Sequence, residues 1–480
     1  MRKKLPLHLL NFIGGSPQEA ASGRRSVVTS PGDGREIATV PDSGAEDVGQ
    51  AVAAAQRAFK TWSQTTPRQR QAALLALADI LQAHDNELAE LEALDAGKPI
   101  IVVRPEELEH GIDNLRFFAG AARLLEGRAA GEYMPGRTSW TRREPVGVVG
   151  GIAPWNYPIL MALWKVGPAI AAGNTVVLKP APSTPVTALR MAELAADAFP
   201  PGVLNVVAGG DEVGQAIVKD PRIAMVSLTG SVETGKWIAR TAADTLKRVH
   251  LELGGNAPVI VFDDADIDDV VPKIAAVGYY NAGQDCTAAT RVIASAKRYD
   301  DIVAGLAEQA KRLVLGDVLS PRTTMGPVNS AGQLQRITGF LDRLDAGSEV
   351  VTGGGRLSGD GFYLEPTVVS AGDPAAEIVQ KEIFGPVMTV QRFTDEEQAL
   401  QWANSTSYGL SASLWTSDVK RALRVSRALQ FGVVWINDHM SQVSEMPHGG
   451  IKDSGYGKDL SMYAVEEYTT VKHVMAAWED

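Results

Sequence analysis

The sequence predicts an α/β protein with two parallel-sheet domains, because short apolar segments rich in β-branched residues alternate with helical ones. The first alternation contains the expected strands VGVVGGIA, TVVLK, VLNVV, AMVSL and HLEL, all between residues 146 and 253. The helices expected between them cover about 158–172, 184–198, 212–219 and 231–244. Such repetition predicts a nucleotide-binding architecture, with ligands at the carboxyl ends of the strands.

A second alternation follows the first. It begins with PVIVF at residue 258, continues with a helix at about 266–280, and runs to VVWIN at 433–437. The glycines of LELGGN, residues 251–256, are the expected junction between the two domains. Two α/β units in a chain of 480 residues agree with the usual size of domains.

The first 45 residues or so read as short strands and turns, and helices follow them. The basic, apolar start MRKKLPLHLL resembles a signal peptide weakly, but Pro6 and His8 interrupt it, so a native first strand is expected. Helical spacing predicts a helix over 44–62. Thr66-Pro67 is a helix start whose pattern runs to about Ala96, and Arg104-Pro105 opens another helix that ends near Leu125.

Composition excludes several functional classes. The longest apolar runs reach about 8–10 residues, short of the roughly 18–20 that span a bilayer. The net charge of −11 and the lack of a basic tract argue against nucleic acid or an anionic membrane as partner. One cysteine rules out an intrachain disulfide and fits a reducing cytoplasm. The seven histidines are scattered without a pair at ligand spacing, so no catalytic metal is expected.

Three residues are candidates for catalysis. Cys286 follows a polar, loop-like stretch in NAGQDCTAA, and a helix-compatible segment after it would lower the pKa of its thiol. Glu252 ends the apolar strand HLEL before two glycines, where a general base could stand. Asn156 in PWNYP offers an uncharged donor for an oxyanion. The alternatives are a buried small hydrophobe, a surface glutamate and a turn asparagine, respectively.

The cofactor signal is weaker. No GxGxxG follows the early strands, so the usual dinucleotide fingerprint is absent. Instead, SLTGSVETGKW predicts a strand, a turn at Gly230-Ser231 and then a helix, whose N-terminus suits a pyrophosphate. Lys179 ends another parallel strand, where it could reach ribose or phosphate oxygens.

From about residue 10 to the C-terminus, the chain resembles the aldehyde dehydrogenase superfamily. The matching strings, in the family's order, are PWNYP, KPAPSTP, SLTGSVETG, LELGGNAP, GQDC, EIFGPV and PHGGIKDSGYGK. The resemblance implies a parallel-sheet cofactor domain, an α/β catalytic domain and a small oligomerisation arm. The cofactor domain would cover residues 1–122 and 144–254, and the catalytic domain would cover residues 255–455. The arm and the C-terminal strand would cover residues 123–143 and 456–480.

The resemblance also implies a reaction and its residues. Cys286 would be the nucleophile that forms a thioester, Asn156 with the Cys286 N–H the oxyanion hole, and Glu252 the base that activates water. The expected cofactor is NAD or NADP. The residues expected to bind it are Ala153, Pro154, Trp155, Lys179, Ala181, Pro182, Gly210, Gly214, Gly230, Ser231, Leu253, Glu382 and Phe384.

Pro182 is a departure from the family pattern. Many NAD-preferring members carry a glutamate there, three residues after the lysine, and it binds both ribose hydroxyls. Without this carboxylate nothing repels a 2′-phosphate, so NADP stays open. NAD is favoured because no basic residue stands there to attract the phosphate.

Within the superfamily, the strings RFFAGAAR, GEYMPG, APVIVFDDADI, GYYNAGQDCTAA and SEMPHGG resemble gamma-aminobutyraldehyde dehydrogenases most. That likeness implies oxidation of 4-aminobutanal to 4-aminobutanoate, a step of polyamine (putrescine) degradation. Betaine aldehyde, another aminoaldehyde or a semialdehyde is the alternative substrate.

Substrate contacts are expected from a few further side chains. A cationic substrate calls for acidic or aromatic groups at the pocket. Glu106, Glu109 and Asp113 share one face of the helix from Pro105, if that face is not simply solvated. Tyr157 could line the tunnel, and Trp435 is a further wall or simply core.

Two other functional classes agree less well with the sequence. A binding protein that has lost catalysis conflicts with the joint presence of Cys286, Glu252 and Asn156. A thiol hydrolase would need a histidine beside the cysteine, and no local motif offers one. The edge-strand pattern of YTTVKHVMA, together with the arm, predicts a homotetramer, or else a homodimer.

Overall fold

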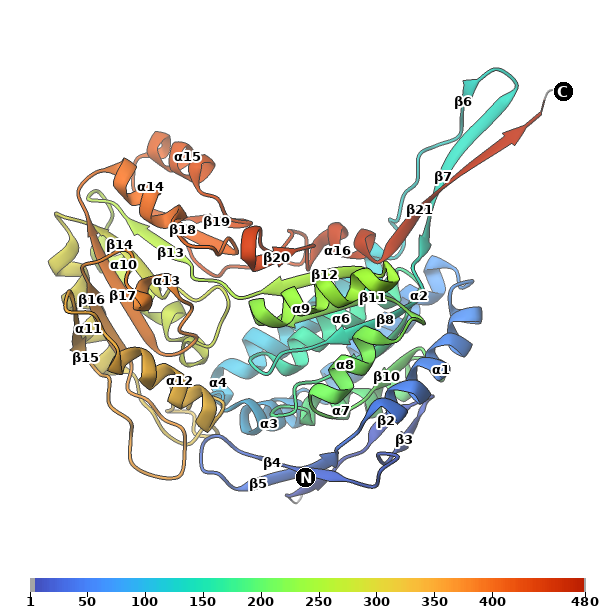
Figure 1. Cartoon of the computed structure of the whole chain (residues 1–480), viewed down its shortest axis with the longest axis horizontal. Helices are drawn as coiled ribbons and strands as arrows, with labels where there is room; N and C mark the ends of the chain where they lie inside the picture. Colours follow the sequence, from blue (N-terminus) through green and yellow to red (C-terminus); the bar gives the residue numbers. More distant parts are fainter. Residues whose placement is uncertain (1–4, 479–480) are drawn as a thin grey trace.

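The computed structural model describes residues 5–478, and two large sheets form its centre (Figure 1). An eight-stranded sheet has the order β20-β12-β11-β8-β9-β10-β2-β3, and a seven-stranded sheet has the order β15-β16-β17-β14-β13-β18-β19. The α/β class predicted from the alternation of strands and helices is therefore confirmed.

In the eight-stranded sheet, the five central strands from β12 to β10 are parallel, while β2, β3 and β20 add antiparallel edges. Its strands are β2 (Asn11–Ile13), β3 (Ser16–Gln18), β8 (Val148–Ile152), β9 (Thr175–Lys179), β10 (Leu204–Val206), β11 (Ile223–Gly230), β12 (Arg248–Leu253) and β20 (Gly455–Tyr456). Strand β20 comes from the end of the chain and pairs with β12 beside Glu252.

Helices cover both faces of this sheet. One face packs on α1, α8 and α9, and the other packs on α6 and α7, with α2 and α5 outside α6. The helices of this part are α1 (Ala45–Trp62), α2 (Pro67–Ala83), α3 (Asp85–Ala96), α4 (Ile100–Val103), α5 (His110–Ala121), α6 (Pro158–Ala171), α7 (Val186–Leu194), α8 (Asp211–Lys219) and α9 (Val232–Ala242), with short turns η2 (Ala195–Asp197) and η3 (Ala243–Thr245).

Two helices differ from expectation. The single helix expected from Thr66 to Ala96 breaks at His84, whose backbone leaves the helical region and whose ring nitrogen bonds to the Ile80 carbonyl. The helix expected from Arg104 begins with a π-helical turn, η1 (Arg104–Glu109). A π-turn places more residues per turn than an α-helix, so it alters which side chains share a face.

The seven-stranded sheet is parallel except for its edge strand β15. Its strands are β13 (Pro258–Val261), β14 (Arg291–Ser295), β15 (Ser348–Thr352), β16 (Thr367–Ala371), β17 (Val387–Phe393), β18 (Ser411–Trp415) and β19 (Val433–Ile436). Its helices are α10 (Ile267–Gly278), α11 (Tyr299–Arg312), α12 (Ala331–Asp342), α13 (Glu377–Gln380), α14 (Glu396–Asn404) and α15 (Val419–Ala428), and η4 (Tyr280–Gly283) follows α10.

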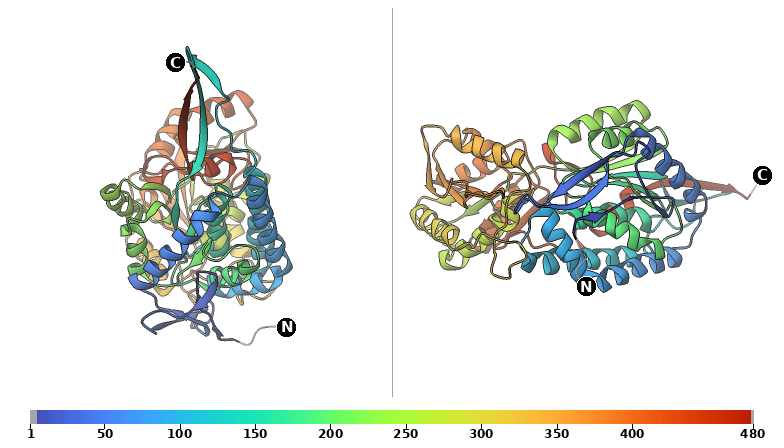
Figure 2. Two further views of the ribbon diagram at one scale, coloured as in Figure 1. Left: turned by 90° about the vertical axis from the view of Figure 1, so that its right-hand side faces the viewer. Right: turned by 90° about the horizontal axis from the view of Figure 1, so that it is seen from below.

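Two smaller sheets complete the described chain. The N-terminal one has the order β1-β5-β4 and contains β1 (Leu7–His8), β4 (Arg25–Thr29) and β5 (Glu36–Pro41). The other has the order β21-β7-β6 and contains β6 (Gly131–Met134), β7 (Arg137–Pro145) and β21 (Thr469–Ala477). Figures 1 and 2 show this second sheet projecting from the body as an arm. Residues 1–4 and 479–480, within the expected first domain and arm, lie outside the described residues.

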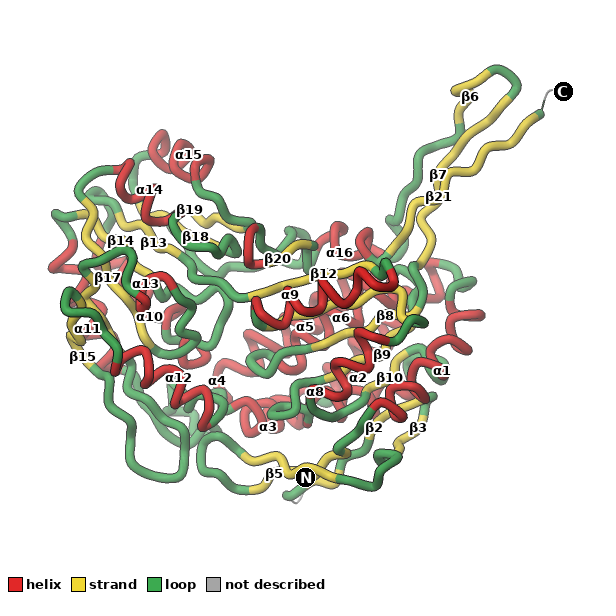
Figure 3. Tube along the Cα trace, in the orientation of Figure 1, coloured by secondary structure: helices red, strands yellow, loops and turns green. Residues whose placement is uncertain are grey.

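Parallel topology brings the functional strand ends together. Because β8, β9, β11 and β12 run the same way, their carboxyl ends share one edge of the sheet. Figure 3 shows loops between the two sheets at this edge. The late chain adds η5 (Lys452–Ser454) and α16 (Ser461–Glu467), and α16 packs on α5 and α6. Among residues 5–478, none of the helices combines the length and the apolarity needed to cross a bilayer.

Candidate active site

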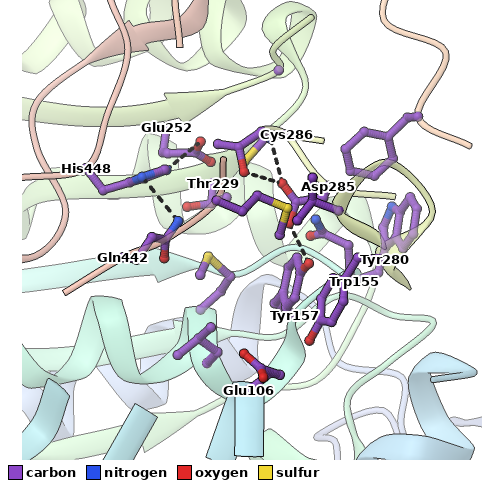
Figure 4. Close-up of a pocket in the computed structure, with 18 of the residues that line it drawn as sticks. Glu106, Trp155, Tyr157, Thr229, Glu252, Tyr280, Asp285, Cys286, Gln442 and His448 are labelled. Atoms are coloured by element: carbon purple, nitrogen blue, oxygen red, sulfur yellow. Dashed lines mark hydrogen bonds and ion pairs between the residues drawn. The ribbon is translucent and has the colours of Figure 1, made fainter. Parts of the chain in front are cut away.

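A cavity of about 730 Å³ lies at this edge, and its wall combines strand ends of the eight-stranded sheet with helix and loop residues that accompany the seven-stranded sheet. Residues from the β8–α6 loop, the end of β12, the loop after η4 and the late chain line it (Figure 4). The three side chains expected to carry catalysis, Cys286, Glu252 and Asn156, all belong to this wall. The structure therefore brings together residues that are far apart in the sequence.

Cys286 lies in the loop between η4 and β14, and no helix begins after it. The expectation of a helix N-terminus that lowers the thiol pKa is therefore wrong. Burial and the nearby carboxylates of Glu252, Asp285 and Glu382 instead raise the pKa of the Cys286 thiol well above its usual range. The thiol consequently needs a base that takes its proton before it can act as a nucleophile.

Glu252 is the candidate for this base. Its side chain is buried, and its Oε1 atom has no hydrogen-bond partner among the described residues. Burial, and secondarily the Asp459 carboxylate, raise the pKa of Glu252 to about 8. A carboxyl group with a pKa this close to neutrality can accept a proton and give it up again under ordinary conditions.

Asn156 is held beside the cysteine loop. Its Nδ2 donates to the Gln284 carbonyl at 3.1 Å, and Asn281 Nδ2 donates to the Asn156 carbonyl at 3.0 Å. Because Gln284 lies two residues before Cys286, these bonds hold the Asn156 amide against the loop that carries Cys286. A fixed amide donor there suits stabilisation of an oxyanion.

Asp285 anchors the loop on the other side. Its Oδ2 accepts from Tyr157 Oη at 2.5 Å, and its Oδ1 accepts from the Thr287 N–H and hydroxyl at 2.6 Å each. Tyr157 stacks on Tyr280 with ring centroids 6.3 Å apart, and Lys98 Nζ lies 3.6 Å from the Tyr157 ring centroid. Asp285 directly precedes the cysteine, and that adjacency was the only signal in the sequence that could have revealed its role.

The expected pyrophosphate turn has the predicted form. Strand β11 ends at Gly230, and the Ser231 hydroxyl caps α9 by accepting from the Thr234 N–H. Gly230, Ser231 and Leu253 line the cavity. The neighbouring Thr229 hydroxyl is buried without a protein partner among the described residues, so a bound group could use it. A helix N-terminus beside unpaired donors fits the phosphates of a dinucleotide.

Lys179 lies at the end of β9 with two of the expected glycines nearby. A Cβ at Gly214 would lie 3.7 Å from Lys179 Cδ, and Gly210 is the residue before α8. Burial lowers the pKa of Lys179 to about 8, with Asp211 opposing the shift. Ala181 is buried, whereas Pro182 is exposed. These residues lie outside the cavity wall.

The nicotinamide side of the expected site lies across the cavity. Glu382 Oε1 accepts from the Gly255 N–H at 2.8 Å, and burial raises the Glu382 pKa to about 7. Phe384 and Trp155 meet edge to face with centroids 5.3 Å apart. Trp155 follows Ala153 and Pro154 at the end of β8, so a cofactor could pass along this strand end.

Only some of the residues expected to contact the substrate line the cavity. Tyr157 lines the cavity, and so does Glu106. Glu109, Asp113 and Trp435 are not in the wall: Glu109 lies 3.6 Å from Arg104, Asp113 accepts from Ser444 Oγ, and Trp435 donates to the Ser441 carbonyl. The shared acidic face assumed α-helical spacing, and the π-turn of η1 changes that spacing.

His448 is a wall residue that the sequence reasoning did not select. Its Nε2 lies 3.9 Å from Glu252 Oε1, and its ring meets Trp164 at 5.4 Å. It stands in the PHGG part of a matching string, but nothing in the local sequence places it near Glu252.

Comparison with known proteins gives consistent results. The model of the aldehyde dehydrogenase family matches residues 18–474. A curated aldehyde dehydrogenase from Emericella nidulans is 42% identical over 468 residues, which cover 96% of this chain and 94% of that protein.

Solved structures are similarly close. An aldehyde dehydrogenase from Bacillus cereus in complex with NAD+ superposes with a TM-score of 0.96 at 38% identity, covering 98% of this chain and 97% of that one. A betaine aldehyde dehydrogenase point mutant from Staphylococcus aureus, with NAD+ and a BME-modified cysteine, gives 0.96 at 37% identity, with coverage of 99% and 97%. These likenesses confirm the predicted fold.

Proposed function

Since the chain belongs to the aldehyde dehydrogenase family, we propose that it oxidises 4-aminobutanal to 4-aminobutanoate, with NAD+ as the hydride acceptor. The observation that carries this proposal is the cavity wall, where Cys286 and Glu252 occur together with aromatic rings and the carboxylate of Glu106. The sequence strings shared with gamma-aminobutyraldehyde dehydrogenases support the same substrate.

The proposed reaction assigns one task to each catalytic side chain. Glu252 takes the proton of the Cys286 thiol, and the sulfur attacks the aldehyde carbon. The Asn156 amide and the Cys286 N–H hold the resulting oxyanion. NAD+, when bound, would supply the hydride acceptor through which the adduct becomes a thioester on Cys286. Glu252 passes the thiol proton to solvent and then removes a proton from water, whose oxygen attacks the thioester. The acid leaves, and the Cys286 sulfur takes the proton back from Glu252.

We propose the cofactor contacts from the same geometry. The pyrophosphate would lie at Gly230 and Ser231, the adenosine ribose at Lys179, and the nicotinamide ribose at Glu382. Pro182 brings neither the carboxylate that would repel a 2′-phosphate nor a basic group that would attract one. NAD+ is proposed over NADP+ because no basic group is present at this position to attract the phosphate. Initial rates with both cofactors test the preference.

Recognition of a cation would begin at the mouth of the cavity. Glu106 is exposed there, while Asp285, deeper in the wall, already accepts hydrogen bonds at both oxygens. Tyr157, Tyr280 and Trp164 add aromatic faces to the wall. An ammonium group would thus meet one free carboxylate and several rings, which attract it by charge and by cation–π contact.

Glu106→Gln should raise the KM for 4-aminobutanal about 3–10-fold, because it removes a partly exposed charge partner. The KM for uncharged butanal should change by less than about twofold, since no charge is lost to it. Steady-state rates with both aldehydes measure the difference. Glu109→Gln is the matched control, because Glu109 is on the same helical segment but outside the wall. Equal effects of Glu106→Gln on both aldehydes, or a wild type that prefers butanal, would refute cation recognition.

Betaine aldehyde is the second candidate substrate. Its trimethylammonium group would meet the same rings, and the Staphylococcus aureus neighbour bears that name. It lacks N–H donors, so a clear preference for it over 4-aminobutanal would point to the rings rather than Glu106. A semialdehyde with a carboxylate is less suited, because the wall's Arg336 already donates to the carbonyls of Glu382 and Ile383.

We propose that the arm joins copies of the chain into a homotetramer, with a homodimer as the alternative. Strand β21 pairs with β7 along one side and has a free edge in the order β21-β7-β6. Apolar side chains are exposed on the arm, among them Tyr133, Val471 and Met475. Exposed apolar groups beside a free strand edge are typical of an association surface. Light scattering on the eluting protein should give the mass of four chains, and the mass of one chain would refute association.

A further inference from the structure

Three side chains of different kinds converge on one side of the cavity (Figure 4). Cys286 Sγ, one oxygen of Glu252 and one ring nitrogen of His448 all lie within 4.8 Å of one another. They come from three separate parts of the chain, the end of β12, the loop after η4 and the segment before η5. The reaction proposed above uses the first two and leaves His448 without a task.

The carboxylate is oriented for a further ligand. Glu252 is 2% exposed, and its buried Oε1 has no hydrogen-bond partner among the described residues, although His448 Nε2 lies 3.9 Å away. That separation is too long for a hydrogen bond. A buried carboxylate oxygen without a partner is costly, so an atom that bound between these groups would remove the cost.

The set of donors matches one class of ion. Thiolate sulfur, imidazole nitrogen and carboxylate oxygen are the ligands of Zn²⁺, and three protein ligands leave the fourth tetrahedral position for water. Zn–N and Zn–O lengths of about 2.0–2.1 Å place two tetrahedral ligands roughly 3.3 Å apart. The 3.9 Å between His448 Nε2 and Glu252 Oε1 therefore needs to close by only about half an ångström.

The surrounding charge favours a cation. Asp285 and Glu382 also line the cavity, and the buried Asp459 is near enough to influence Glu252. The buried Lys165, whose charge also acts on Glu252, is paired with Asp459 at 3.3 Å. Acidic groups thus outnumber basic ones around the three ligands.

We propose that Cys286, Glu252 and His448 form an inhibitory binding site for Zn²⁺ in the cofactor-free enzyme. Binding exchanges the thiol proton, which passes to solvent, for a sulfur–zinc bond and involves no redox step. The ion occupies the nucleophile and the base together, so inhibition is reversible by a chelator and competitive with the aldehyde. The inference does not depend on which aldehyde is oxidised, because metal binding is measured without substrate.

The test uses the purified full-length chain, freed of metal and without cofactor. Zn²⁺ is titrated by calorimetry, and Co²⁺ is added in parallel because a thiolate–cobalt bond gives a charge-transfer absorption band. The wild type should bind a single ion per chain and show the band. His448→Phe and His448→Gln should each weaken Zn²⁺ binding at least about tenfold, the lower end of what loss of a supporting group costs a metal site.

His110→Phe is the matched control. His110 lines the same cavity but is not among the three ligands, so its loss should leave Zn²⁺ affinity within about twofold. Cys286→Ser should abolish the cobalt band. If both His448 variants bind Zn²⁺ as tightly as the wild type, the metal binds the thiol alone and the proposal is overturned. Equal weakening by His110→Phe would also overturn it, since binding would then be diffuse.

Discussion

Replacing Cys286 with alanine should lower kcat at least about 10⁴-fold, the scale of loss seen when the nucleophile of covalent catalysis is removed. The reason is that no other thiol exists in the chain, so no second residue can form the thioester. The reduction of NAD+ to NADH during oxidation of 4-aminobutanal, followed by absorbance, measures the loss. Intact-protein mass after mixing wild type with aldehyde and NAD+ should reveal an acyl adduct that the variant lacks.

A folding control accompanies this result. Cys286→Ala should still bind NAD+, as measured by quenching of tryptophan fluorescence, because Trp155 and the proposed cofactor residues are unchanged. Turnover above about 1% of the wild type in the purified variant would contradict a thioester mechanism. Cys286→Ser should be nearly as inactive, since a hydroxyl beside Glu252 is a much weaker nucleophile than a thiol.

Glu252→Gln should slow formation of the thioester and then prevent its hydrolysis. The variant should lose about 10²–10⁴-fold in steady-state rate, which is the usual contribution of a general base. If a trace of thiolate still forms, it should give a slow burst of NADH and an acyl-enzyme that persists. Added hydroxylamine, which attacks a thioester without a base, should release this acyl group. Glu106→Gln is the matched control, because it makes the same change in the same cavity and should not trap the thioester.

The pH dependence of the wild type follows from the same carboxyl group. Only ionised Glu252 can take a proton, so activity should rise as pH increases through its pKa of about 8. At pH 7 about a tenth of the molecules carry the ionised form and at pH 9 about nine tenths, so the rate should rise roughly tenfold. Single-turnover hydrolysis measured across this range should show the rising limb, and Glu252→Gln should lack it. If the hydrolysis rate of Glu252→Gln rises with pH as it does in the wild type, the group that titrates is not Glu252.

The sequence predicted most of the fold because its strands and helices are encoded locally. The apolar segments TVVLK and AMVSL became β9 and β11, and the helix expected over 212–219 matches α8. The predicted helices were wrong at places where the local sequence pattern does not determine the backbone conformation. The break at His84 depends on one side chain that bonds to a carbonyl of the preceding turn, and the π-turn of η1 inserts residues that no 3.6-residue periodicity reveals.

The candidate site likewise contains residues that the sequence could predict and residues that it could not. Cys286, Glu252 and Asn156 were found because each stands in a distinctive string, and the parallel topology implied that strand ends would meet. His448 could not be found, because its place beside Glu252 depends on the path of the late chain. The prediction of a lowered thiol pKa was wrong because it was based only on the residues after Cys286. The carboxylates of Glu252 and Glu382, which raise this pKa, come from elsewhere in the fold.

The pairing of strand β20 has a consequence for the folding of the chain during its synthesis on the ribosome. It pairs with β12 so that Gly455 lies opposite Glu252, and Ser454 Oγ donates at 2.7 Å to the Gly254 carbonyl, 200 residues earlier. The edge that holds the proposed base is therefore unfinished until almost the whole chain has been synthesised. Contacts over such distances in the sequence form late and slowly. We expect the nascent enzyme to remain without activity until translation is nearly complete, and a ribosome-stalled chain that ends before Ser454 should bind no substrate productively.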